Sequence, residues 1–342
     1  MGMPKKAKGK KAGKAKKNGG GKGKAKGPVP EEILFDAQMA LNDQDFETAE
    51  MLLRQAVEMA PDDIEVVEAL GELLMEMGEE QEAVDLLRHA VTISPHVGFQ
   101  KFLSLGQLLE GEQATASVRH GIELLRQEGE QAREAGDEEA AEELREKLAA
   151  GICMLAEMHI RESGDDIKDE AAAEIEPLLK QAVDLAPDSP EPLQVFASFR
   201  MSQRRGEDGL ELLKQSMAMW MAPEGLKGDE LMAWAGENIE GLPSYEFRYE
   251  CAKMLLEVEQ PEESVRVLEL LLFENDSVPD TWYLLALIHN NLGELDDALE
   301  CLDAGIKILK DAPPGDETAE MFDEMKKDVV AAMEAAGPGG GE

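Results

Sequence analysis

The residue types that could perform acid–base, nucleophilic or metal chemistry are scattered along this sequence of 342 residues. The histidines lack metal-ligand spacing to cysteines or acids; they are His89, His96, His120, His159 and His289. Three widely spaced cysteines, Cys153, Cys251 and Cys301, form neither a CxxC motif nor a disulfide framework. Phosphate-binding loops, zinc-protease helices and nucleophile elbows have no counterpart here. We therefore expect a protein that is not an enzyme and needs no metal or cofactor.

Charge is distributed very unevenly along the chain. Residues 1–27 contain eleven lysines and no acid, whereas the whole chain has a net charge of −39. Lysine, glycine and alanine dominate this tail, and such a composition cannot bury enough surface to offset the entropy of ordering. We expect a disordered Lys/Gly-rich tail over residues 1–29, followed by a strongly acidic body.

Clustered lysines in the tail match the pattern of a nuclear import signal. The cluster is Lys5, Lys6, Lys10, Lys11, Lys14, Lys16 and Lys17. The same pattern fits a weak, nonspecific RNA-binding arm, a solubilising segment, or a segment that folds back onto the acidic body. An import receptor is accordingly one expected partner. No stretch approaches the roughly 18 to 20 apolar residues that cross a bilayer, and the lysines precede no apolar signal segment, so we expect a protein of the cytoplasm and nucleus without a membrane partner.

Beyond the tail, small and apolar residues recur with a step of 34 residues. Ala37, Ala49, Leu53, Ala56 and Pro61 recur as Gly71, Ala83, Leu87, Ala90 and Pro95. The same register relates Leu179 and Ala182 to Leu213 and Ser216, and Ala252, Ser264 and Leu268 to Ala286, Ala298 and Leu302. This period and these residue types resemble the tetratricopeptide repeat (TPR), in which two antiparallel helices approach closely at the small positions. The resemblance implies an all-α superhelical solenoid.

The register also predicts the domain organisation. We expect a solenoid of about seven repeats over residues 30–311, with an extended helical insertion near 123–170, then a capping helix and a Gly-rich end over 312–342. In the third repeat the spacing between small positions shortens to eight residues. Its second helix is predicted to continue through 127–147, before an apolar helix over 148–160. Residues 223–241 read as an irregular connection, and 316–335 as a polar-faced final helix.

In TPR arrays, certain positions of each first helix face the concave groove where ligands lie. In the second repeat this set is Glu65, Glu68, Glu72, Met75 and Glu76. Three of these glutamates follow each other at intervals of four residues, an arrangement that destabilises an isolated helix by a few tenths of a kcal/mol per pair. Either the groove attracts a basic ligand, or this is simply a solvated acidic face.

The other first helices add acidic, apolar and tyrosine side chains to the predicted groove. The sixth repeat contributes Glu246, Tyr249, Leu256 and Glu257, the seventh Asp280, Tyr283, Leu287, Asn290 and Asn291, and the first Leu34, Gln38, Leu41 and Asn42. In the first and second repeats, the first helix contains no Lys or Arg. TPR adaptors that clamp a terminal carboxylate need such cations, so the sequence argues against an adaptor of that kind.

Several segments are more specific than the repeat itself. They read HVGFQKF from residue 96, PEPLQ from 190, LPSYEFRYE from 242 and WYLL from 282. In order and spacing they resemble the eukaryotic TPR chaperones dedicated to the fourth protein of the large ribosomal subunit, over about residues 30–310. Where that family commonly continues WYLL with Gly-Trp, this chain has Ala286-Leu287.

The resemblance implies a chaperone that shields the internal Lys/Arg-rich extension of a newly made ribosomal protein and delivers it to nuclear pre-ribosomes. An acidic groove would supply the counter-charge that such an extension otherwise finds on RNA. The alternatives are a generic TPR scaffold for another basic partner such as histones, and an RNA-associated adaptor acting through the lysine tail.

Overall fold

The computed structural model describes residues 30–336 except 165, 166, 168, 224, 227, 312 and 314, and within this part every regular element is helical. The lysine-rich tail of residues 1–29 lies outside the described residues. The chain divides into two compact units, the first ending at Glu79 and the second starting at Glu80. The expected all-α class is confirmed.

The first unit contains three helices, α1 (Pro30–Asn42), α2 (Phe46–Met59) and α3 (Ile64–Glu76). Asp45 and Asp63 are the N-cap residues of α2 and α3. Their carboxylates accept hydrogen bonds from the backbone N–H groups of Thr48 (3.1 Å) and Glu65 (3.2 Å). The helices α1 and α2 pack as a hairpin, and α2 also packs on α3.

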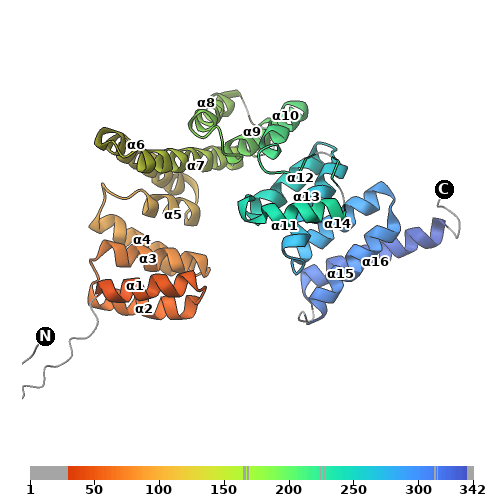
Figure 1. The fold of residues 1–342 in the computed structure, drawn as a ribbon, viewed down its shortest axis with the longest axis horizontal. Helices are drawn as coiled ribbons and strands as arrows, with labels where there is room; N and C mark the ends of the chain where they lie inside the picture. The colour runs from red at the N-terminus through yellow and green to blue at the C-terminus, as the bar shows by residue number, and fades with distance from the viewer. Residues whose placement is uncertain are drawn as a thin grey trace, which may run out of the picture. The chain divides into compact units, whose positions relative to one another are not determined.

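The second unit contains the remaining helices in chain order. They are α4 (Glu80–Ile93), α5 (Gln100–Leu108), α6 (Gly111–Ala135), α7 (Glu138–Ser163), α8 (Asp169–Leu185), α9 (Glu191–Ser202), α10 (Gly206–Met217), α11 (Asp229–Asn238), α12 (Tyr245–Glu257), α13 (Pro261–Glu274), α14 (Pro279–Leu292), α15 (Leu295–Ile308) and α16 (Glu317–Ala336), with short 3₁₀ turns at Ile239–Gly241 and Leu309–Asp311. Consecutive helices from α4 to α10 and from α12 to α16 pack against each other (Figure 1).

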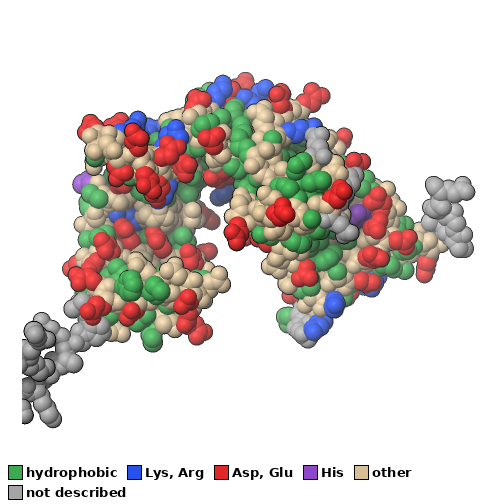
Figure 2. All heavy atoms as spheres, viewed as in Figure 1, with side chains coloured by type: hydrophobic (Ala, Val, Ile, Leu, Met, Phe, Trp, Pro, Cys, Tyr) green, Lys and Arg blue, Asp and Glu red, His purple; other side chains and the backbone are tan. Residues whose placement is uncertain are grey.

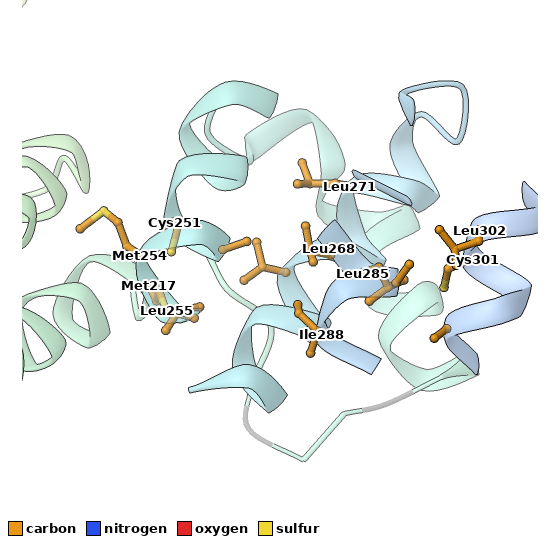
Figure 3. Close-up of a cluster of buried hydrophobic side chains, with 14 of the residues drawn as sticks. Met217, Cys251, Met254, Leu255, Leu268, Leu271, Leu285, Ile288, Cys301 and Leu302 are labelled. Carbon is orange, nitrogen blue, oxygen red and sulfur yellow. The ribbon is translucent and has the colours of Figure 1, made fainter. Parts of the chain in front are cut away.

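The positions of the 34-residue register form the interior of both units. Ala37, Ala49, Leu53 and Ala56 are fully buried, and so are their counterparts Ala83, Leu87 and Ala90 one period later. In the α12–α13 hairpin the small Ser264 is buried and its hydroxyl donates to the carbonyl of Ala252, 2.8 Å away. Cys251, Leu268, Leu285 and Ile288 lie inside the same α12–α15 core (Figure 3). The small residues therefore act as predicted, by letting paired helices approach.

Two local expectations about helix boundaries are wrong. The predicted helix through 127–147 is interrupted, because α6 ends at Ala135, Gly136 adopts a left-handed conformation (φ 76°), and Asp137 caps α7 by accepting from the N–H of Ala140 (3.1 Å). The two long helices instead lie side by side (Figure 1). Residues 223–241 also contain a regular helix, α11, whose Leu231 and Ala235 are buried with Leu270 of α13.

Gly106 of α5 and Gly129 of α6 differ in how closely a neighbouring helix approaches them, so alanine should have opposite effects at the two positions. A Cβ added to Gly106 would lie 2.2 Å from Val118 Cγ2, whereas one added to Gly129 meets only Leu144 Cβ at 3.8 Å. We expect Gly106→Ala to lower the free energy of unfolding by about 1–3 kcal/mol through overpacking. Gly129→Ala should raise it by about 0.5–1 kcal/mol, because alanine restricts the unfolded chain and favours the helix. Urea denaturation followed by circular dichroism measures both, and equal effects of the two substitutions would contradict this packing.

Candidate partner-binding surface

In the first unit, the acidic face of α3 has the predicted arrangement. Glu68 and Glu72 are half-buried on the helix and Glu76 is exposed at its end. Burial, followed by the neighbouring carboxylates of Glu68 and Glu76, raises the pKa of Glu72. Met75 is half-buried and Glu65 is exposed in the first turn. Like charges therefore do share one helix face, as the spacing of four residues predicts.

The second unit contains an acidic cavity where α7, α9 and α12 meet. This open cavity has a volume of about 870 Å³, and its lining includes five glutamates and one lysine. These residues are Glu157 on α7, Glu191 on α9, and Glu246, Glu250, Lys253 and Glu257 on α12. Of the residues predicted to bind a partner, the structure brings Glu246 and Glu257 together here. On the face seen in Figure 2, acidic side chains outnumber basic ones over both units.

Carboxylates from different helices influence each other in this acidic cavity. The side chain of Glu157 is exposed at its surface, but desolvation by the surrounding protein, followed by the carboxylate of Glu191, raises its pKa to about 7, while Arg161 acts in the opposite direction. Burial also raises the pKa of the half-buried Glu191. The cavity is therefore a place where added negative charge is unfavourable and a cation is favoured.

This electrostatic arrangement predicts a pH-dependent effect of Glu157→Gln. Because the pKa of Glu157 is raised from its ordinary value near 4.5 to about 7, the native chain is penalised progressively as the pH rises through that window. Solvent screening of this exposed group reduces the effect without changing its sign. We expect Glu157→Gln to raise the melting temperature relative to wild type more at pH 8 than at pH 5.5. A constant difference between the two pH values in thermal denaturation would contradict the raised pKa.

The one lysine that lines the cavity, Lys253, is already paired with a neighbouring glutamate. Lys253 Nζ lies 2.9 Å from both carboxylate oxygens of Glu250, and 5.9 Å from the ring centre of Tyr249. This exposed pair is internally balanced, so the lysine offsets little of the charge contributed by the glutamates on α7 and α9.

The predicted tyrosines have partners within the fold. The hydroxyl of Tyr249 donates to the carbonyl of Asp280 at 3.4 Å, and burial, then the carboxylates of Asp280 and Glu250, raise its pKa to about 12. The ring of Tyr283 packs edge-on against Phe322 of α16, with 5.2 Å between the ring centres. Both tyrosines are half-buried, so each has a structural role whether or not it also contacts a partner.

Sequence reasoning missed most residues of the cavity, among them the polar residues Glu157, Glu191, Gln194 and Glu250. Glu157 lies on α7, outside the 34-residue register, so no repeat position could be assigned to it. The other three lie on predicted first helices. A search for acids on neighbouring first helices would have found Glu191 and Glu250, but not their proximity to α7.

One further group of acids and histidine lies apart from this cavity. Ligand atoms of His289, Glu294 and Asp297 lie within 4.8 Å of one another, the one such group among the residues that the structure describes. The spacing of the histidines had indicated no metal-ligand arrangement. His289 Nδ1 is 2.7 Å from Glu294 Oε2, a hydrogen bond that accounts for their proximity without an ion.

Comparison with known proteins identifies the class of protein. Residues 40–96 and 279–308 match family models described as tetratricopeptide repeat. Together with the buried 34-residue register, these matches show that the fold is built from tetratricopeptide repeats. Within the described ranges, no helix is both long and apolar enough to span a membrane.

Within that class the similarity is more specific, and the predicted resemblance is confirmed. A solved structure titled "Assembly Chaperone of RpL4 (Acl4) (Residues 1-338)" superposes with a TM-score of 0.64 at 27% identity, covering 79% of this chain and 98% of that one. A Schizosaccharomyces pombe protein named "Probable assembly chaperone of rpl4" is 27% identical over 264 residues, 74% of this chain and 71% of that protein. An Emericella nidulans protein of the same name is 27% identical over 291 residues, 79% of this chain and 67% of the relative.

Proposed function

We propose that this chain is a non-enzymatic assembly chaperone for ribosomal protein L4 that binds a basic, Lys/Arg-rich internal extension of its client. The observation that carries the proposal is the acidic cavity at α7, α9 and α12, with five glutamates around one open volume. The names of the relatives supply the identity of the client. The acidic face of α3 in the first unit is proposed as a second region of contact.

The proposed mechanism is shielding by counter-charge. A basic extension without RNA exposes many cations, and the acidic cavity offers carboxylates in place of phosphates. The raised pKa of Glu157 favours this exchange, since an incoming cation relieves the repulsion between carboxylates. Ribosomal RNA carries a denser array of negative charge, so it competes for the same cations and promotes release.

Delivery to nuclear pre-ribosomes is proposed through the lysine-rich tail as an import signal. The experiment is to follow the nuclear fraction of the full chain and of a variant without residues 2–27. Loss of nuclear accumulation with retained client binding supports import through the tail. Unchanged localisation rejects it, and tighter client binding after the deletion assigns the tail to competition for the acidic body.

Direct binding tests the chaperone proposal. The purified full chain should form a complex with ribosomal protein L4 at moderate salt, lose it when the basic extension of L4 is deleted, and release it on addition of ribosomal RNA. Core histones serve as a matched basic control. Equal binding to histones would favour a generic scaffold for basic partners, and binding unaffected by deletion of the extension would reject the proposed contact.

A further inference from the structure

One face of α1 exposes two large apolar side chains between acids. Phe35 is 62% exposed, and Met39, one turn later, is 48% exposed. Glu32 and Asp36 are also exposed, and they lie on the same face, because residues three, four and seven positions apart along a helix are neighbours. Over α1, Figure 2 shows hydrophobic side chains with acidic ones around them. We call these four residues the α1 face.

The 34-residue register shows what the same face does in the next repeat. The residues one period after the α1 face are Val66, Ala69, Leu70 and Leu73 of α3. Val66, Leu70 and Leu73 are buried. Val66 shares an apolar cluster with Ala56 of α2, the second helix of the preceding repeat, and α2 and α3 pack together. The positions of the α1 face are therefore positions on which a preceding helix packs, but in α1 they are exposed.

The chemistry of the α1 face is mixed. Where α3 has Val66 and Leu70, α1 has the acids Glu32 and Asp36, as expected for the polar outer face of a terminal repeat. Phe35 and Met39 depart from that expectation, because covering two large apolar side chains removes apolar area from water and is favourable. The face thus combines apolar contacts with negative charge.

Charge complementarity decides which occupant fits. A two-fold contact with a second copy would bring Glu32 and Asp36 close to the same acids, and a nucleic acid or an anionic membrane would meet the same repulsion. Residues 1–29 supply lysines, but their large apolar side chains are only two methionines and one valine, so they offer little to cover Phe35 and Met39. The fitting occupant has cations and an apolar stripe together.

We propose that the α1 face binds a basic amphipathic helix of a partner protein, which lies where a preceding repeat would place its second helix. Lysine or arginine side chains of this helix pair with Glu32 and Asp36, and its leucine, methionine or phenylalanine side chains pack on Phe35 and Met39. Such helices are recognised through apolar residues at positions i, i+3, i+4 and i+7. The inference goes beyond the proposed function and does not depend on it, because the acidic cavity lies on α7, α9 and α12 of the second unit.

A 14-residue helical peptide, equal in length to α2, tests the inference on the full-length chain. Its leucines follow the amphipathic spacing and its other residues are lysines, whereas a scrambled peptide has the same composition without an apolar face. By fluorescence anisotropy, we expect wild type to bind the amphipathic peptide about tenfold more tightly. Phe35→Ser combined with Met39→Ser should abolish this preference. Met51→Ser combined with Met59→Ser is the matched control and should retain it, because these side chains of α2 are also 62% and 48% exposed.

A second variant tests the charge of the α1 face. Glu32→Lys combined with Asp36→Lys should weaken binding of the amphipathic lysine peptide about tenfold, because two exposed attractions become repulsions. The same variant should gain affinity for a peptide in which glutamate replaces every lysine. Unchanged binding of both peptides would contradict the proposed pairing.

Equal affinity of wild type for the amphipathic and scrambled peptides overturns the inference, and so does a preference that survives in the folded serine variant of Phe35 and Met39. Dimerisation of wild type that this variant abolishes would assign the face to a second copy instead. Peptide binding that appears only after deletion of residues 2–27 would assign it to the tail. Complex formation with L4 through the acidic cavity is measured separately, so the proposed function can stand when this inference fails.

Discussion

Phe322→Ala is expected to lower the free energy of unfolding of the C-terminal helices by about 3–5 kcal/mol, the range for a buried phenylalanine whose removal leaves a cavity. Phe322 is fully buried, and its ring contacts Tyr283 of α14. It also fills the space that Gly305 of α15 leaves free, where an added Cβ would lie only 2.1 Å from Phe322 Cε1. One ring thus joins α14, α15 and α16, so its loss should release the final helix.

Hydrogen exchange measured by mass spectrometry is the appropriate readout, because repeat arrays do not always unfold in a single step. Peptides from α15 and α16 should lose protection in Phe322→Ala while those from α9 and α10 change little. Met321→Ala is the matched control, since this neighbouring side chain is 48% exposed and surface substitutions usually change stability by about 0.5 kcal/mol or less. Similar protection in the two variants would show that α16 is held by other contacts.

The small positions of the 34-residue register and the final helix were predictable from the sequence, whereas the contact that Phe322 makes was not. The register places small residues such as Ala286 and Ala298 at helix–helix contacts, and both are fully buried. The final helix was predicted as well, at residues 316–335 against the observed Glu317–Ala336. That Gly305 accommodates the ring of Phe322 was not predicted, because the approach of a ring to one glycine on another helix leaves no periodic trace in the sequence.

The region around α6 and α7 shows why other parts were not predictable. Both helices exceed the usual repeat length, so the 34-residue period no longer fixes their ends. The residues that set the break, Gly136 and Asp137, are an ordinary C-cap and N-cap pair, a local signal outweighed here by the long acidic helical pattern.

The candidate site was predicted only where it follows the repeat. Glu246 and Glu257 were chosen from helix positions and do line one cavity. Their acidic neighbour Glu157 comes from the irregular helix α7, and Gln194 of α9 lines the same cavity while its Nε2 donates to the carbonyl of Phe247 on α12. Charge type is readable from composition and helix phase, but the grouping of charges from α7, α9 and α12 is a tertiary property.

The combined substitution of Glu157, Glu246 and Glu257 by lysine is expected to weaken binding of the L4 extension by about 100-fold, since each exposed reversal turns an attraction of about 1 kcal/mol or less into repulsion. All three side chains are exposed and lie on helices, so helicity should change little. The dissociation constant measured at several salt concentrations should also show a flatter salt dependence, because fewer charge pairs are formed.

A matched variant separates the local effect of these charges from that of net charge. Lysine in place of Glu112, Glu320 and Glu334 changes the total charge equally at exposed positions outside the cavity. If the cavity is the contact, this control should retain most of the affinity, because its three positions do not line the cavity and exposed charges are screened by salt. Equal loss in both variants would mean that the acidic body attracts the extension as a whole, and full affinity in the cavity variant would move the contact to another surface.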